Sequence, residues 1–323
     1  MKYCILFLSA AFGTLTAADF PQADISNWVV KARLYLPDAQ KGYYRATRFD
    51  WSGVIASLEY QGHNFFGQWF DKYDPKIHDA IMGPVEEFLT PNRTGLGYDD
   101  VKPGENFVKI GVGAIRKPDE PRFRQFGTYD IADFGTWSIS KHPDYVAFIQ
   151  ELTDTAGYAY VYRKTVRLTS GKPQLVLEHS LKNTGRKTIE TNVYEHNFYM
   201  LDNQPAGPDY VVHFPFELSI NGDLRGLAEL RGKDFAYLKE LEKGQTAAGD
   251  LLGFGGTAKD YDIRVENRKA GIGVRQVGDQ PVTRMYFWSI RTTVCPEAYI
   301  SMKIQPGKEF TWRIAYDFYT LNP

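Results

Sequence analysis

The sequence has few cysteines, and this limits how the chain can be cross-linked. Of its two cysteines, Cys4 lies in an apolar N-terminal stretch and Cys295 lies in the body of the chain. Once the N-terminal stretch is removed, no intrachain disulfide can form. Apolar Val294 and Pro296 flank Cys295, so we expect a buried, unreactive thiol rather than a nucleophile.

Long apolar runs are also missing beyond the first residues, which have the pattern of a signal peptide. Lys2 supplies positive charge, residues 5–12 form a short apolar core, and residues 16–18 are small. No segment approaches the roughly 20 continuous apolar residues that a membrane-spanning helix needs. We therefore expect residues 1–18 to be removed, leaving residues 19–323 as one periplasmic or secreted domain without membrane association.

Charge of one sign does not predominate. The 38 basic and 39 acidic residues leave a formal net charge of -1 and are mixed along the chain. This argues against nucleic-acid binding and against electrostatic binding to a membrane surface. The chain also has no GxSxG elbow, no HExxH zinc motif, no phosphate loop and no dinucleotide fingerprint. We expect no cofactor and no metal ion, because the histidines and acids match no sequence-local ligand spacing.

Aromatic residues, by contrast, are abundant, and much of the chain alternates between apolar and polar side chains. There are 21 Tyr, 21 Phe and 6 Trp. Segments 144–152, 158–168 and 174–181 alternate in this way between turns that contain glycine or proline. The pattern predicts antiparallel strands with one buried face. The best helical candidate is the short segment 235–241, so we expect an all-β chain of two large antiparallel sheets.

The segment 192–201 is the first candidate for chemistry. It places His196 beside Glu195 among aromatic residues, after a strand and a turn. An imidazole exchanges a proton near neutral pH, and flat aromatic faces stack on sugar rings. Neighbouring side chains of a strand point to opposite faces, so Glu195 and His196 are not expected to act on one substrate. The alternative is a histidine that is hydrogen-bonded in the core.

Four short motifs occur in an order shared with a known superfamily. Residues 181–185 and 192–201 resemble its strand, turn and histidine segment, residues 295–298 (Cys-Pro-Glu-Ala) resemble its Pro-Asp-Ala, and residues 304–310 resemble its closing hairpin. The chain thus resembles the galactose mutarotase-like superfamily, which includes the aldose 1-epimerases. The resemblance implies an all-β supersandwich of large antiparallel sheets whose concave face binds a carbohydrate.

The resemblance also implies a pair of proton-transfer groups. In that superfamily a histidine protonates the ring oxygen and a glutamate removes the proton of the anomeric hydroxyl, each contributing about 10²–10⁴-fold. His196 fits the acid, but the family's glutamate falls at Arg291, which cannot accept a proton. Glu86 and Glu87 are then the candidate partners. As strand neighbours, one of them should face the pocket while the other is solvated.

Four further residues are predicted to bind the substrate. Arg291 can hold a carboxylate or developing negative charge through its planar guanidinium. His78 lies in the segment that carries pocket-lining arginines in the superfamily, and Asn197 follows the histidine. Arg48 lies in a dense aromatic cluster, where it either binds the ligand or braces the sheet through an ion pair.

These residues lead to two classes of function. The first is an exported carbohydrate-active enzyme, either an aldose 1-epimerase-like isomerase or a lyase that acts by β-elimination on an acidic or oxidised sugar. The second is a carbohydrate-binding protein that has kept the fold without the catalytic glutamate. The distance from His196 to a carboxylate across an open groove distinguishes the two classes.

Overall fold

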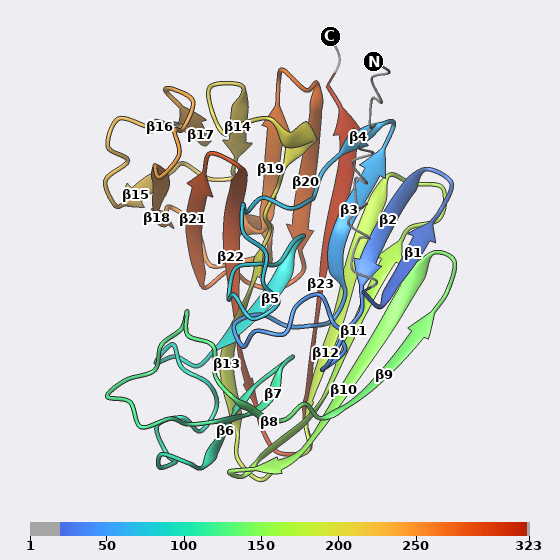
Figure 1. Cartoon of the computed structure of the whole chain (residues 1–323). Coiled ribbons are helices and arrows are strands. Elements are labelled where there is room, and N and C mark those ends of the chain that lie inside the picture. The colour runs from blue at the N-terminus through green and yellow to red at the C-terminus, as the bar shows by residue number, and fades with distance from the viewer. Residues whose placement is uncertain (1–19, 322–323) are drawn as a thin grey trace, which may run out of the picture.

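The computed structural model describes residues 20–321, and nearly all of their regular structure is β-strand (Figure 1). The predicted signal segment therefore lies outside the described residues. Among these residues there are two short 3-10 helices, Leu201–Asn203 (η1) and Ala258–Asp260 (η2). Within the described range, no helix has the length and apolar character needed to cross a membrane. The prediction of an all-β chain with large antiparallel sheets is confirmed.

The larger of the two main sheets has ten strands, and all of its neighbouring strands are antiparallel. In spatial order they are β16 (Ala228–Arg231), β17 (Asp234–Tyr237), β14 (Tyr210–His213), β19 (Asp262–Asn267), β20 (Ile272–Gly278), β23 (Glu309–Thr320), β12 (Gln174–Asn183), β11 (Tyr158–Leu168), β10 (Tyr145–Thr155) and β9 (Thr136–Lys141). The helix predicted over 235–241 was wrong. This segment begins within β17, whose pairing with both β14 and β16 overrides a weak local helix tendency.

The second main sheet has six strands, and two small sheets accompany it. Its order is β15 (Ser219–Asn221), β18 (Thr246–Leu252), β21 (Arg284–Ile290), β22 (Thr293–Ile304), β13 (Ile189–His196) and β5 (Val85–Leu89). The small sheets are formed by β1 (Gln22–Ser26), β2 (Val30–Tyr35), β3 (Val54–Tyr60) and β4 (His63–Asn64), and by β6 (Asn106–Lys109), β7 (Gly113–Arg116) and β8 (Ile131–Asp133).

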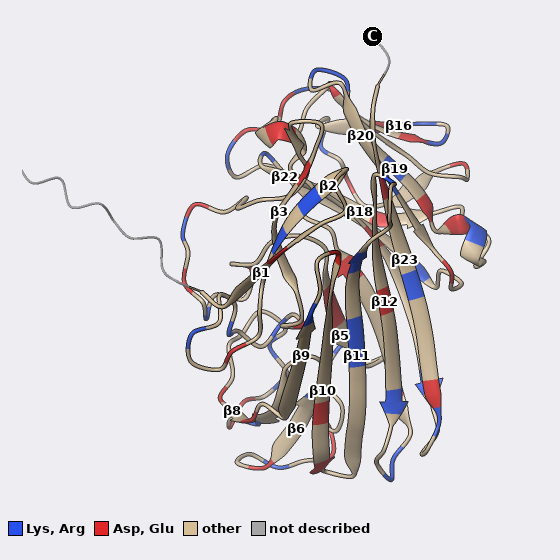
Figure 2. Ribbon diagram, turned by 90° about the vertical axis from the view of Figure 1, so that its right-hand side faces the viewer, with Lys and Arg blue, Asp and Glu red and all other residues tan. Residues whose placement is uncertain are grey.

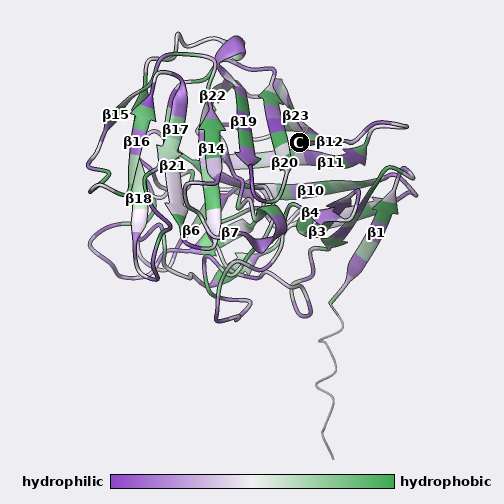
Figure 3. Ribbon diagram, turned by 90° about the horizontal axis from the view of Figure 1, so that it is seen from above, coloured by the Kyte–Doolittle hydropathy of each residue, from purple (hydrophilic) through white to green (hydrophobic). Residues whose placement is uncertain are grey.

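The main hydrophobic core lies between the two large sheets. Leu177 on β12 and Ile314 on β23 belong to the same buried cluster as Val193 on β13 and Ile300 on β22. Figure 3 shows hydrophobic residues along the strands and hydrophilic residues in many of the connecting loops. Burying an aliphatic side chain of this size contributes about 1.5–3 kcal/mol. The inner face of the six-stranded sheet therefore packs in the core, and its outer face is not part of this inter-sheet packing.

Four neighbouring strands of the ten-stranded sheet carry charges of both signs between them. Figure 2 shows Asp and Glu on β10, Lys and Arg on β11, and both kinds on β12 and β23. Arg167 on β11 and Glu178 on β12, for example, pair across the strands with Nε and Oε2 3.6 Å apart. This mixing agrees with the near-zero net charge of the sequence.

The edge strand β5 is covered on its open side by polar groups from other segments. The amide nitrogen of Asp50 donates a 2.9 Å hydrogen bond to the carbonyl oxygen of Glu86. The Nζ atom of Lys109 donates a 2.9 Å hydrogen bond to the carbonyl oxygen of Phe88. These contacts tie the loop before β3 and the end of β6 to the edge of the six-stranded sheet.

Candidate functional site

A cleft of about 630 Å³ lies on the outer face of the six-stranded sheet, within the size range of small-molecule sites. Alternate side chains of the strands enter either this cleft or the inter-sheet core. On β13, Glu195 faces the core near His179 while His196 lines the cleft, as predicted. The sheet contributes Tyr194, His196, Asp250, Arg284, Tyr286, Trp288, Glu297 and Tyr299, and the loops contribute Arg48, His78, Asp79, Arg93, Gln125 and Phe126.

His196 is held in the floor of the cleft by aromatic rings. Its imidazole stacks on Phe198 with ring centroids 3.9 Å apart and meets the edge of Trp288 at 5.4 Å. Only 4% of the residue is exposed. Burial, together with the nearby positive charge of Arg48, holds the pKa of His196 well below its usual value. The imidazole is therefore uncharged at neutral pH, so His196 fits a proton acceptor and not the acid that the resemblance implies.

Glu297 on β22 lies beside His196 in the same floor. Its Oε1 atom is 3.4 Å from His196 Nε2, and its Oε2 atom accepts a 3.2 Å hydrogen bond from the hydroxyl of Tyr299. Burial raises the pKa of Glu297 to about 8, against the opposing effect of Arg48. Near neutral pH the carboxyl keeps its proton, so a proton donor and a proton acceptor meet at one place.

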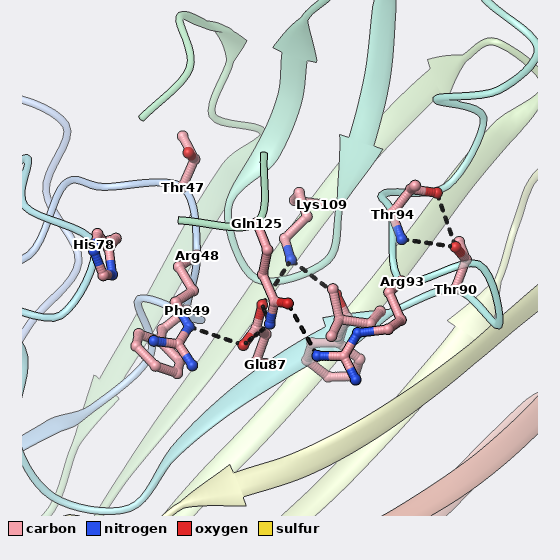
Figure 4. A network of polar contacts seen from close by, with 12 residues as sticks. Thr47, Arg48, Phe49, His78, Glu87, Thr90, Arg93, Thr94, Lys109 and Gln125 are labelled. Carbon is pink, nitrogen blue, oxygen red and sulfur yellow. Dashed lines mark hydrogen bonds and ion pairs between the residues drawn. The ribbon is translucent and has the colours of Figure 1, made fainter. Parts of the chain in front are cut away.

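Arg48 forms one wall of the cleft and is fixed from several sides. Its guanidinium lies between the rings of Phe49 and Phe126, with the carbon atom 4.3 and 4.8 Å from their centroids. It donates to the carboxylate of Asp79. Its Nε atom donates a 2.9 Å hydrogen bond to Glu87, which Figure 4 shows. Cation–π contacts and charged hydrogen bonds of this kind hold the planar fork in one orientation.

His78 also reaches the cleft from the loop before β5. Its Nδ1 atom lies 2.9 Å from an oxygen of Asp79, and its ring lies 5.2 Å from that of Phe126. Burial alone would raise the pKa of Asp79, but His78 and Arg48 together hold it below its usual value. The structure therefore brings three of the candidate site residues, His78, Arg48 and His196, into one cleft.

Glu87 lies behind the cleft wall, and its side chain is fully buried. Besides the bond from Arg48, it accepts a 2.5 Å hydrogen bond from the hydroxyl of Tyr194 and a 3.0 Å bond from the amide of Gln125. Arg48, Tyr194 and Gln125 all line the cleft. Glu87 thus positions three cleft residues and does not itself contact the open space, contrary to its predicted role as proton partner.

Glu86 enters the opposite side of the sheet, so its predicted catalytic role does not fit its position. It is fully buried between the large sheets, with Oε2 2.5 Å from Nζ of Lys164 and Oε1 2.6 Å from Nε2 of His179. Glu86 and Glu87 point to opposite faces of the sheet, as strand alternation predicts. The expectation that one of them is solvated was wrong, because loops cover the outer face of β5 as well.

Arg291 and Asn197 are not part of the cleft, which corrects their predicted role in substrate binding. Arg291 lies in the turn between β21 and β22, where its guanidinium pairs with Glu240 on the surface. Asn197 is buried, donates a 2.6 Å hydrogen bond to the carbonyl oxygen of Pro296 and accepts one from the hydroxyl of Tyr316. Asn197 therefore braces the strand end after His196.

Glu86, His179 and Glu195 form a group of metal-ligand types in the inter-sheet core. One ligand atom from each lies within 4.8 Å of the others. The ammonium of Lys164 already compensates Glu86, and burial followed by the charge of Glu86 raises the pKa of Glu195 well above its usual value. A protonated Glu195 and the ammonium therefore keep this cluster close to neutral without an added cation.

Sequence reasoning missed Glu297 as a proton-transfer group, although it lies in the recognised Cys-Pro-Glu-Ala motif. The first eight residues of β22 are all buried, so no alternation of exposure marks the residue that faces the cleft. It also missed Arg284, whose Nε donates a 2.6 Å hydrogen bond to Asp250 and whose guanidinium lies over Tyr286 and Tyr299. Arg284 lies two residues before Tyr286 in β21, so strand alternation could have predicted that both side chains face the cleft.

The arrangement of sheets matches solved structures over almost the whole chain. An aldose epimerase homologue from C. elegans superposes with a TM-score of 0.58 at 14% identity, covering 93% of this chain and 99% of that one. The chain has the galactose mutarotase-like fold. A second protein of this fold, a galactose mutarotase-like protein from Lactobacillus casei, gives a TM-score of 0.56 at 12% identity and covers 92% of this chain and 100% of its own.

A galactose mutarotase related enzyme from Lactobacillus acidophilus also shares the fold, with a TM-score of 0.55 at 14% identity, covering 93% of this chain and 98% of its own. No protein-family model and no curated protein sequence matches the chain. The similarity thus lies in the galactose mutarotase-like architecture, and the residues of the cleft must carry any argument about activity.

Proposed function

We propose that this protein is an exported aldose 1-epimerase-like enzyme that interconverts the anomers of a sugar by acid–base catalysis. The observation that carries the proposal is the contact between His196 and Glu297 in the floor of the cleft. One is a neutral base and the other an uncharged acid near pH 7. The pattern of residues 1–18, which is that of a signal peptide, supports export.

Ring opening of a cyclic sugar needs one proton to leave and one to arrive. In the proposed reaction, His196 takes the proton from the anomeric hydroxyl at O1, and Glu297 gives its proton to the ring oxygen O5. The C1–O5 bond breaks and leaves an open-chain aldehyde. After rotation about the bond from C1 to C2, the reverse transfers close the ring as the other anomer and restore both groups.

The walls of the cleft suit a sugar. Trp288 and Tyr286 on β21 are partly exposed in the cleft and offer aromatic surface, which packs on the apolar side of a pyranose ring. Arg48 and Arg284 offer fixed donors to hydroxyl groups, because Asp79 and Asp250 hold their guanidinium groups in place.

The test measures the exchange of anomers by proton NMR, starting from a panel of pure α-anomers of neutral and acidic sugars. We expect His196→Ala and Glu297→Gln each to lower the catalysed rate by about 10²–10⁴-fold. His142→Ala is the matched control, because His142 is exposed and lies outside the residues that line the cleft. It should keep the wild-type rate.

Two outcomes would overturn the proposal. One is a wild-type protein that accelerates the exchange of none of the sugars, which would leave a carbohydrate-binding protein of the same fold. The other is undiminished turnover in Glu297→Gln with an unchanged unfolding midpoint. That result would show that the His196–Glu297 pair is not the catalytic machinery.

A further inference from the structure

Arg93 is presented to the cleft by a fixed turn that follows β5. The amide of Arg93 donates a 2.8 Å hydrogen bond to the carbonyl oxygen of Thr90, and the amide of Thr94 donates to the Thr90 hydroxyl over 3.1 Å. Arg93 itself has a φ of 62°, a left-handed conformation that is uncommon for a residue with a side chain. Figure 4 shows the turn and the Arg93 side chain pointing toward Gln125.

The guanidinium of Arg93 has no carboxylate partner within residues 20–321, unlike the other two arginines of the cleft. Its single hydrogen bond goes from Nη2 to Oε1 of Gln125, over 3.1 Å. Arg48 pairs with Asp79 and Glu87, and Arg284 pairs with Asp250. An arginine has five N–H donors, so most of those on the exposed Arg93 remain open to a ligand.

Among residues 20–321, the charge of Arg93 is the one in and behind the cleft that has no carboxylate beside it. Arg48 pairs with Asp79, Arg284 pairs with Asp250, and Glu87 lies between Arg48 and Lys109, whose Nζ atom is 3.8 Å from its Oε1 atom. Glu297 holds its proton near pH 7, and His196 is neutral there. Burial raises the pKa values of Tyr286 and Tyr299 on the opposite wall, and the charge of Arg93 acts against this rise. An anionic group bound at this point would thus face the reacting pair from the rim of the same cleft.

Arg93 also marks the junction between the cleft and a second hollow of about 610 Å³. Both spaces are lined by Arg93 and Gln125. The second hollow is bordered by Lys117, whose Nζ atom donates to the carbonyl oxygens of Tyr98 and Val101 and lies 4.3 Å above the ring of Tyr98. A ligand that fills the cleft can therefore continue past Arg93 into a hollow where two further cations, Lys117 and Arg122, lie beside the carboxylates Asp99 and Glu120.

We propose that the ligand of this site is an acidic oligosaccharide. Its reducing-end sugar lies against His196 and Glu297, and the acidic group of the next sugar binds Arg93, from which the chain enters the second hollow. This inference rests on the proposed function, since it places the reacting anomeric carbon at the His196–Glu297 pair. Arg93 is then the residue that selects charged over neutral glycans, because a guanidinium binds carboxylate and sulfate groups through paired hydrogen bonds.

The experiment compares the binding of four probes by isothermal titration calorimetry. The probes are digalacturonate, a sulfated disaccharide, the monosaccharide galacturonate and the neutral disaccharide lactose. We expect Arg93→Gln to weaken the binding of the preferred acidic disaccharide by about 10- to 100-fold and to leave lactose unaffected. Arg291→Gln, which removes a surface arginine paired with Glu240 outside the cleft, should change neither affinity.

The two acidic disaccharides show which anionic group binds Arg93. Tighter binding of digalacturonate identifies a carboxylate, and tighter binding of the sulfated disaccharide identifies a sulfate. Equal binding of digalacturonate and galacturonate would overturn the second subsite. Equal effects of Arg93→Gln and Arg291→Gln would overturn the role of Arg93. Failure of both acidic disaccharides to bind the wild type would overturn the acidic ligand. Loss of anomer exchange in Glu297→Gln, with a neutral sugar, tests the proposed function separately.

Discussion

Replacing Lys164 with methionine should destabilise the protein far more than replacing a surface lysine. The Nζ atom of Lys164 lies 2.5 Å from Oε2 of Glu86 and 4.0 Å from Oδ2 of Asp50, and all three side chains are fully buried. Methionine fills a similar volume but leaves Glu86 without its nearest positive charge. Removing one partner of a buried ion pair costs about 3–5 kcal/mol, because the other charge stays uncompensated in a medium of low polarity.

The matched control is Lys303→Met, which breaks a pair of similar length on the surface. Lys303 Nζ lies 2.8 Å from Oε2 of Glu190, but these side chains are 62% and 50% exposed. Exposed pairs contribute about 0–1 kcal/mol. Urea unfolding followed by tryptophan fluorescence gives the free energy of unfolding of each variant. The thermal unfolding midpoints of Lys164→Met and Lys303→Met should differ by about 10 °C.

The double variant Lys164→Met/Glu86→Gln sharpens the test. If the loss in Lys164→Met comes from a stranded charge, removing the charge of Glu86 as well should recover part of it, with a coupling of about 0.5–3 kcal/mol. Equal stabilities of Lys164→Met and Lys303→Met would refute the reasoning. A double variant less stable than the sum of its single variants would show that packing, and not charge, dominates at this site.

Two further predictions concern groups in and beneath the cleft. Anomer exchange should be constant at mildly acidic to neutral pH and fall as the pH rises through about 8, because Glu297 then loses the proton it must donate; a rate that is flat to pH 10 would contradict this. In the protein without residues 1–18, Cys295 should react with a thiol reagent only on unfolding, since burial raises its pKa and excludes the reagent. Fast labelling under native conditions would count against the buried position.

Much of the fold followed from the two-residue alternation in the sequence. The segments 144–152, 158–168 and 174–181 correspond to β10, β11 and β12, whose apolar faces contact the core. Alternation also separated Glu195 from His196 correctly. It failed at 235–241, where strand pairing with distant segments decides the structure and the local pattern carries no record of those partners.

The cleft was predicted in part, and its omissions have a physical cause. His196, His78 and Arg48 lie in it. His196 was named from its aromatic segment and the resemblance, His78 from the resemblance, and Arg48 because it lies in an aromatic cluster, where a buried charge needs a partner. Glu297 was missed because both faces of β22 are covered there. Arg93 was missed because it lies in a turn, where neither of the two regular periods indicates the direction of a side chain.

The covered edge of β5 has a consequence for self-association. An exposed edge strand offers unpaired carbonyl and amide groups to another chain, which is a common route to aggregation. Here the carbonyl oxygens of Glu86 and Phe88 are already occupied by the amide of Asp50 and the ammonium of Lys109. The polar network behind the cleft thus also keeps the six-stranded sheet from adding a strand of a second molecule at this edge.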